Sequence, residues 1–228
     1  MKNSFYLFFA LILLAACDKA DEAIKFHFIQ PNQNEISLMS SERLLIETLT
    51  PEDLSFICSN SFVARVNIDG WVYATRLGTA FIRVTNGYLQ DEIKLIVTPR
   101  SELYAEPVKD FSLSKSKVKA IEGKPFSETE TSLSYQVENP KSPLKTYVFD
   151  NKNKLYSSSV LVQKTENEEL TVFLDERYRY HTGFEYYSDA LIIEESTLLV
   201  AVDDFDGEFV QVTYYPIIHL NTPTVIKQ

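Results

Sequence analysis

The sequence predicts a mainly β protein in which a β-sandwich precedes an α+β domain, an antiparallel sheet with two helices on one face. The chain contains 13 Tyr and 15 Phe but only 6 Gly, a composition that favours sheets over long helices. Short alternating apolar runs are separated by turn pairs such as Asp69-Gly70 and Asn86-Gly87. Helical periodicity is confined to two stretches in the second half of the chain, near residues 112–123 and 165–180.

The first region, residues 23–99, contains only strand patterns. Ile24, Phe26 and Phe28 alternate with other residues at the period of a half-buried strand. Further strands are predicted at 43–48, 54–58, 63–67, 71–75, 79–85 and 92–97. Regular short strands with turns between them imply a sandwich.

Three segments of this region carry a family resemblance. They are Ser59-Asn60-Ser61-Phe62-Val63-Ala64-Arg65-Val66, Asp69-Gly70-Trp71-Val72-Tyr73-Ala74 and Gly78-Thr79-Ala80-Phe81-Ile82-Arg83-Val84. In order and spacing they resemble the Val-Ala-x-Val, Gly-x-Val-x-Ala and Gly-Thr-Ala-x-Ile-x-Val segments of the bacterial Ig-like group 2 repeat. The resemblance covers about residues 35–98 and implies an Ig-like β-sandwich. It departs at Phe56, where the family commonly has Trp.

The alternation in these strands predicts a group of outward-facing aromatic residues. If Val72 and Ala74 face the core, then Trp71 and Tyr73 face outward, and so does Phe81 on the next strand. Large aromatic residues on an outer face indicate a contact surface. Two interpretations stay open: another part of the chain covers them, or they form a stacking platform for a glycan or a protein.

A Pro-marked segment, residues 100–109, is predicted to be a linker. In the second region, residues 110–216, a short helix is predicted with Ser112 or Ser114 as its cap and Gly123 as its end. A second helix is predicted from the capping box at Thr165 to about Tyr180. Strands are predicted at 132–137, 145–150, 154–164, 184–187, 190–194, 198–202 and 209–214, followed by a tail at 217–228.

The order α-βββ-α-ββββ is typical of an antiparallel sheet with both helices on one face. In order and texture it resembles small α+β domains that follow Ig-like domains in uncharacterised Bacteroidota lipoproteins, a likeness that implies no activity. A second aromatic cluster lies around the predicted end of the second helix; it comprises Tyr180, Phe184, Tyr186 and Tyr187. Residues of these types form interface hot spots and sugar platforms, or else they pack at the rim of a core.

The amino-terminal stretch predicts a lipid anchor. Lys2 precedes a short apolar run from Phe5 to Leu14, which is too short to span a bilayer. The segment Leu14-Ala15-Ala16-Cys17 resembles the lipobox of bacterial lipoproteins. The resemblance implies a signal peptide at 1–16 and lipid attachment at Cys17. We therefore expect an outer-membrane protein held by lipid.

Within the acidic tether at 17–22, the cluster Asp18-Lys19-Ala20-Asp21-Glu22 resembles the surface-export signals of Bacteroidota lipoproteins. This resemblance favours the cell surface, with the periplasmic face as the alternative. The other interpretation of the cluster is a solvated linker that keeps the anchor away from the fold. If Cys17 carries lipid, Cys58 has no disulfide partner in the chain, which contains 2 Cys.

The sequence contains no motif typical of catalysis. The formal net charge of −10 makes nucleic acid an unsuitable partner. The three His residues, His27, His181 and His219, have no metal-ligand spacing, and we expect neither a metal nor a cofactor. We expect a non-catalytic binding or adhesion module for an extracellular protein or glycan. The alternatives are a periplasm-facing structural or assembly factor, and a hydrolase or inhibitor with an unrecognised site. The sequence does not indicate an oligomeric state.

Overall fold

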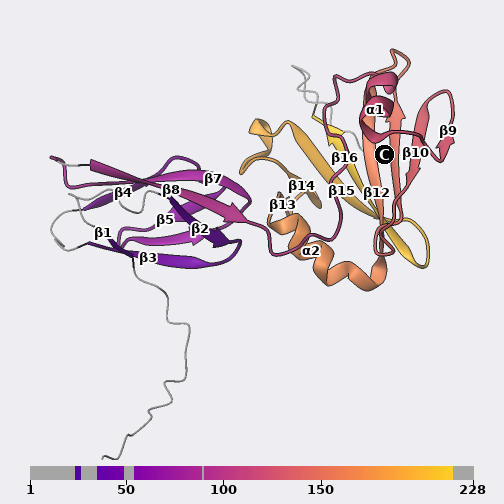
Figure 1. Cartoon of the computed structure of the whole chain (residues 1–228). Helices are drawn as coiled ribbons and strands as arrows, with labels where there is room; N and C mark the ends of the chain where they lie inside the picture. Colours follow the sequence, from indigo (N-terminus) through magenta and orange to yellow (C-terminus); the bar gives the residue numbers. More distant parts are fainter. Residues whose placement is uncertain (1–23, 27–34, 49–53, 89, 218–228) are drawn as a thin grey trace, which may run out of the picture.

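The computed structural model describes residues 24–26, 35–48, 54–88 and 90–217. Strands account for 47% of the chain and helices for 13%, which confirms the predicted mainly β fold. Figure 1 shows the strands in two bodies side by side, which we call the first unit (residues 24–98) and the second unit (residues 100–217). The predicted signal peptide, Cys17 and the acidic tether lie outside the described residues.

The first unit consists of two four-stranded sheets, ordered β1-β3-β6-β5 and β2-β8-β7-β4. One buried cluster takes side chains from both sheets, so the sheets pack face to face. The strands are β1 (Ile24–Phe26), β2 (Glu35–Met39), β3 (Arg43–Thr48), β4 (Ser55–Cys58), β5 (Ala64–Val66), β6 (Trp71–Ala74), β7 (Gly78–Thr85) and β8 (Gln90–Thr98).

The predicted register of β6 and β7 is confirmed. Val72, Ala74, Ile82 and Val84 are buried, whereas the residues between them are exposed or half-buried. Gly70 has a φ of 85°, and a Cβ there would lie 2.9 Å from the carbonyl oxygen of Ile46. Only glycine fits that turn without a backbone shift. Strand β2 was not predicted from the sequence.

The second unit is built on one eight-stranded antiparallel sheet, ordered β13-β14-β15-β16-β12-β11-β10-β9. Two α-helices accompany it, α1 (Lys115–Glu122) and α2 (Asn167–Asp175), with two short 3-10 turns, η1 (Lys164–Glu166) and η2 (Ile193–Glu195). The strands are β9 (Ser127–Glu128), β10 (Ser132–Gln136), β11 (Leu144–Phe149), β12 (Leu155–Gln163), β13 (Arg179–His181), β14 (Tyr186–Ser188), β15 (Leu198–Asp204) and β16 (Phe209–Pro216).

Both α-helices cover the same face of this sheet, as predicted. Val118 of α1 packs with Tyr147, and Phe173 of α2 packs with Tyr214. Tyr147 and Tyr214 are each aligned with Ser158 across neighbouring strands. Since aligned residues of adjacent antiparallel strands point to one side, the two helices share a face.

The second helix is shorter than predicted, and the capping box at Thr165 does not form. Helix α2 ends at Asp175. The Thr165 hydroxyl donates to the side-chain oxygen of Gln163 and does not cap the helix. The carbonyls of Glu176 and Tyr178 accept hydrogen bonds from the first unit, so they do not continue the helical ladder. The chain then forms β13, where the prediction had a helix end. The predicted strand at 190–194 is also wrong, because η2 begins within it.

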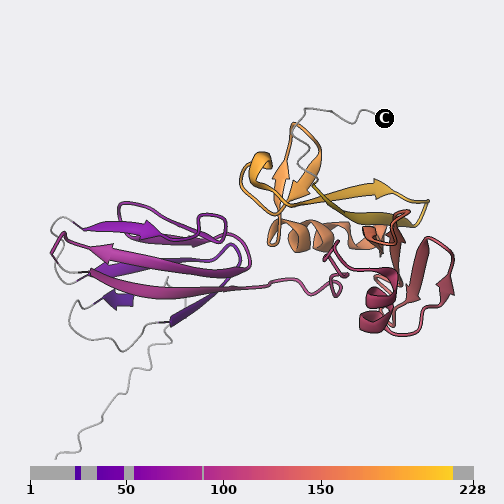
Figure 2. The ribbon, with the colours of Figure 1, turned by 90° about the horizontal axis from the view of Figure 1, so that it is seen from above.

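The predicted linker at 100–109 packs closely against the second unit, and we call it the strap. Leu103 and Tyr104 are buried in the core that also holds α2. The Tyr104 hydroxyl lies 2.8 Å from that of Tyr214. The Val108 N–H donates to the Tyr147 hydroxyl over 3.2 Å. Figure 2 shows the chain leaving β8 and running directly into the second unit. The strap therefore belongs to the packing of the second unit.

A buried carboxylate lies where the two units meet. Glu176, with 1% of its surface exposed, accepts the backbone N–H groups of Arg100 at 2.9 Å and Ser101 at 3.1 Å. Its Oε1 also pairs with the Arg177 guanidinium at 2.6 Å. A buried charge is tolerated only with such a set of partners.

Two hydrogen bonds cross from the first unit to the second. Leu77 N–H donates to the Glu176 carbonyl over 2.8 Å. Arg76, 8% exposed, donates from Nε to the Tyr178 carbonyl over 2.9 Å. Burial and, after it, the charge of the nearby Arg179 lower the pKa of Arg76 to about 10, while Asp175 opposes the shift. Together with the Glu176 cluster, these bonds hold the first unit against the second.

Candidate functional site

The outer face of the β3-β6-β5 sheet carries a group of arginine and aromatic side chains. Tyr73 on β6 is aligned with Arg43 on β3 and with Arg65 on β5. All three are exposed, and 38% of the Tyr73 surface is accessible. Trp71 lies on the same side of β6, two residues away. We call these four residues the arginine–aromatic face.

Trp71 is held in place by neighbours on both sides. The guanidinium carbon of Arg43 lies 4.7 Å from the centroid of the Trp71 ring, a cation–π contact. On the backbone side, Asn67 Oδ1 accepts the N–H of Trp71 at 2.8 Å and that of Asp69 at 3.1 Å. The half-buried indole is therefore fixed by a side chain from β3 and by the turn that precedes β6.

A depression of ≈ 500 Å³ opens beside Tyr73. It is lined by Arg65, Val66, Asn67, Tyr73 and Thr75. The Arg65 guanidinium forms no hydrogen bond or ion pair with any other residue that the structure describes. The depression thus combines an aromatic wall with a cation whose donors are available.

Phe81 does not join this face, contrary to the prediction. It lies on β7, which belongs to the other sheet of the sandwich, and 40% of its surface is exposed there. Both β6 and β7 turn their alternate residues into the common core, so Phe81 and Tyr73 point to opposite outer faces. Of the three predicted residues, the structure brings together only Trp71 and Tyr73.

The second predicted cluster forms the β13–β14 hairpin, but its rings lie in two separate pairs. Tyr180 and Tyr187 pair across the strands with centroids 4.9 Å apart. Tyr187 packs against the core, and burial followed by the charge of Asp175 raises the pKa of Tyr187 to about 12.

Phe184 and Tyr186 stack at the hairpin turn with centroids 5.5 Å apart, and 59% of Phe184 is exposed. Tyr186 and Tyr187 are adjacent strand residues, so the two pairs lie on opposite sides of the hairpin. The four rings therefore do not form one platform.

A hydrogen-bonded chain that sequence reasoning missed lies beside this hairpin. The Ser188 hydroxyl lies at the centre of the chain. Its Oγ is 2.7 Å from His181 Nε2 and accepts a hydrogen bond from the Ser196 hydroxyl over 2.8 Å. Both serine side chains are buried, and Ser188 also donates to the Ala190 carbonyl. Burial and this donated bond favour a role in fixing β14 to the loop before β15. His181 and Ser188 follow no motif spacing, so nothing in the sequence signalled this contact.

The remaining reactive groups are engaged locally. In the part of the chain that the structure describes, no group of three or more His, Cys, Asp or Glu could hold a metal ion. Cys58 is a free thiol that contacts the Ala64 carbonyl, and burial raises its pKa. In the acidic β15–β16 hairpin, Asp206 accepts two backbone N–H groups and Asp204 pairs with Lys164. That hairpin is therefore a self-bonded turn.

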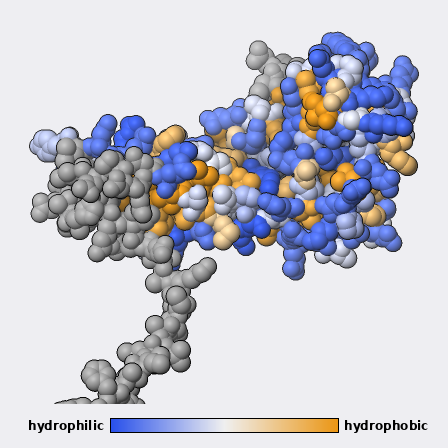
Figure 3. All heavy atoms as spheres, viewed as in Figure 1, coloured by the Kyte–Doolittle hydropathy of each residue, from blue (hydrophilic) through white to orange (hydrophobic). Residues whose placement is uncertain are grey.

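Among the described residues, no helix is long and apolar enough to cross a membrane. Over the second unit, the face seen in Figure 3 shows apolar side chains in small groups among hydrophilic ones. That face therefore displays no single large apolar patch.

Comparisons with known proteins leave the family of this chain open. No family model matches it, and no curated protein matches it. Among solved structures it is similar to domains 5–6 of the S-layer protein SbsC, with 10% identity and a TM-score of 0.25, over 81% of each chain. Domains 4 and 5 of that protein give 18% identity and a TM-score of 0.20, over 74% of this chain and 60% of that one. Domains 4–9 of that protein give 10% identity and a TM-score of 0.26, over 81% of this chain and 26% of that one. Similarities of this size carry no argument about fold or function.

Proposed function

We propose that this chain is a lipid-anchored cell-envelope protein that binds an extracellular glycan without catalysing a reaction. The observation that carries the proposal is the exposed Tyr73 ring beside the depression on the arginine–aromatic face. Aromatic rings offer flat apolar surfaces with a polar edge, and they suit the C–H faces of sugar rings. Trp71, fixed beside Tyr73, supplies a second ring on the same face.

The anchor rests on the resemblance of Leu14-Ala15-Ala16-Cys17 to the lipobox. Several acyl chains, each contributing about 0.8 kcal/mol per buried methylene, hold a protein stably in a membrane. Cys17→Ser should therefore move the protein from the membrane fraction to the soluble fraction. Protease treatment of whole cells tests which face of the outer membrane carries the protein. Digestion of the protein on intact cells supports surface display, and protection from the protease supports the periplasmic face.

Binding is tested with the full-length protein in detergent on an array of glycans. Tyr73→Ala should weaken glycan binding by about tenfold or more, the loss of about 1.4 kcal/mol that a contact ring supplies. The matched control is Phe81→Ala, which removes an equally exposed ring from the opposite sheet of the same unit.

Two outcomes would count against the proposal. One is glycan binding that survives both Tyr73→Ala and Trp71→Ala. The other is binding that depends instead on Phe184 or Tyr186 at the β13–β14 hairpin. Circular dichroism of each variant establishes that the sheet content is unchanged.

A further inference from the structure

We infer that the arginine–aromatic face selects acidic glycans, polysaccharides that carry carboxylate or sulfate groups. This inference rests on the proposed function and specifies its ligand class. The observation behind it is the placement of two arginines on either side of Tyr73, each aligned with it across a strand pair. Adjacent strands lie about 4.8 Å apart, so the Arg43 and Arg65 backbones are separated by about 10 Å with the ring between them.

The positive charge of this face contrasts with the rest of the chain, whose formal net charge is −10. Two acidic residues close to this face in the sequence, Glu42 and Asp69, form local hydrogen bonds. Glu42 accepts the N–H of Met39 at 2.7 Å, and Asp69 accepts from the Asn67 amide at 3.3 Å. Neither forms an ion pair with Arg65 among the contacts that the structure describes.

The guanidinium of Arg65 presents five N–H donors in a planar fork, and this fork matches the paired oxygens of a carboxylate or sulfate. Because Arg65 forms no ion pair with another residue that the structure describes, the depression is complementary to a negative ligand.

The shape of the site favours a sugar over an acidic protein. A stable protein partner buries about 800 Å² on each side, which needs a broad complementary surface. The depression of ≈ 500 Å³ instead offers one ring wall at Tyr73 beside the polar side chains of Arg65 and Asn67. These features suit a compact ring that carries an anionic substituent toward Arg65.

The test uses the full-length protein in detergent with four soluble probes: dextran, dextran sulfate, polygalacturonate and poly-glutamate. Dextran and dextran sulfate share a backbone and differ in charge, whereas polygalacturonate separates carboxylate from sulfate. We expect at least one acidic polysaccharide to bind about tenfold or more tightly than dextran, with an affinity that falls as salt is added.

Arg65→Gln should weaken the binding of that acidic polysaccharide about tenfold or more and leave dextran binding unchanged. The charge-matched control is Arg83→Gln. Arg83 is exposed on the opposite sheet and pairs with Glu92 at 3.6 Å. The Arg83→Gln substitution should leave the binding of all four probes unchanged.

Three results would overturn the inference. Equal weakening by Arg65→Gln and Arg83→Gln would mean that general charge drives binding. Equal binding of dextran and both acidic polysaccharides, insensitive to Arg65→Gln, would refute acidic selectivity while leaving the proposed function in place. Poly-glutamate binding at Arg65 without binding of any polysaccharide would identify an acidic protein as the ligand and refute the proposed function as well.

Discussion

Glu176 shows how one buried charge can hold separate parts of a chain together. Its carboxylate accepts from Arg100 and Ser101 and pairs with Arg177. Glu176→Gln would remove the ion pair and turn an amide donor toward groups that already donate. We expect the free energy of unfolding to fall by about 3 kcal/mol, the lower end for breaking a buried pair. Urea unfolding of the full-length chain measures this change.

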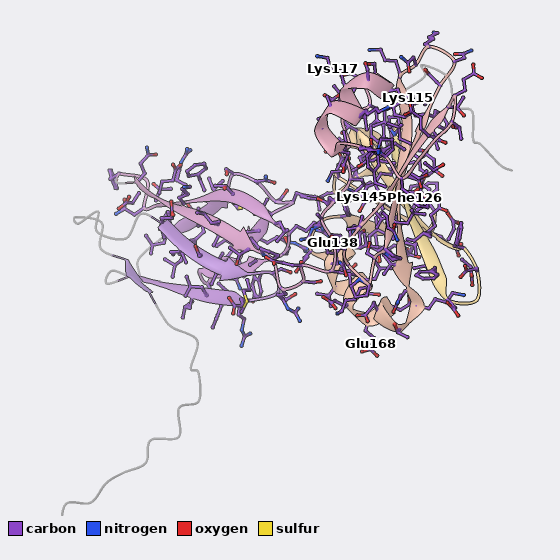
Figure 4. All side chains as sticks on the ribbon, turned by 45° about the vertical axis from the view of Figure 1, so that its right-hand side comes forward. Lys115, Lys117, Phe126, Glu138, Lys145 and Glu168 are labelled. Carbon is purple, nitrogen blue, oxygen red and sulfur yellow. The ribbon has the colours of Figure 1, made fainter. Side chains whose placement is uncertain are left out.

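The control for this substitution is Glu168→Gln on α2, the helix that ends just before Glu176. Figure 4 shows Glu168 projecting away from the fold on α2, and its side chain is exposed. A surface change of this kind should alter stability by less than about 0.5 kcal/mol. Equal effects of the two substitutions would contradict a structural role for the Glu176 cluster.

Single residues also show how far the candidate site could be predicted. The two-residue period of β6 was enough to place Trp71 and Tyr73 outward. It could not show that Arg43 and Arg65 flank Tyr73, because alignment between strands depends on how the sheet pairs. For the same reason, the outward position of Phe81 was predicted but its sheet was not.

At the scale of elements, the strap and the strands beneath it are joined by buried tyrosines. Burial raises the pKa of Tyr104, Tyr178 and Tyr214 above the ordinary value of 10.0, and the carboxylate of Glu106 adds to the shift in each. In the unfolded chain these phenols would ionise near pH 10. Between pH 10 and their folded pKa values, the unfolded state therefore binds fewer protons than the folded state.

The sign of this linkage predicts loss of stability in alkali. The stabilising contribution of each buried phenol is fully present below pH 10 and declines as pH rises above it, by up to about 1.4 kcal/mol per pH unit. We expect the ultraviolet absorbance of tyrosinate to rise together with the loss of circular dichroism. Complete titration of all 13 tyrosines near pH 10 with native circular dichroism would contradict the prediction.

Elements differ in how well the sequence predicts them. Strands next to a turn pair, such as β6 and β7, were predicted to within one residue. The second helix was overextended because Tyr178 fits the apolar stripe of α2. It does reach the same core, but from beyond the helix end at Asp175. Periodicity records which side chains are buried, and it does not record where the backbone leaves the helix.

For the whole molecule, the central question is whether the two units behave as one body. Units joined within a chain move relative to one another unless their interface is strong. Here Arg76 reaches the Tyr178 carbonyl and Leu77 reaches the Glu176 carbonyl, while the carboxylate of Glu176 holds the start of the strap. Such coupling should make the two units unfold together.

The chain contains a single tryptophan, Trp71, which lies in the first unit and serves as a fluorescent probe of that unit. In urea, Trp71 fluorescence should report the first unit, while circular dichroism reports all sheets. We expect coincident midpoints in the unchanged protein. Arg76→Gln shortens the side chain and loses the bond to Tyr178, so the two midpoints should separate. Arg83→Gln, on the outer face of the same unit, should leave them coincident. Separate midpoints already in the unchanged protein would mean that the two units fold independently.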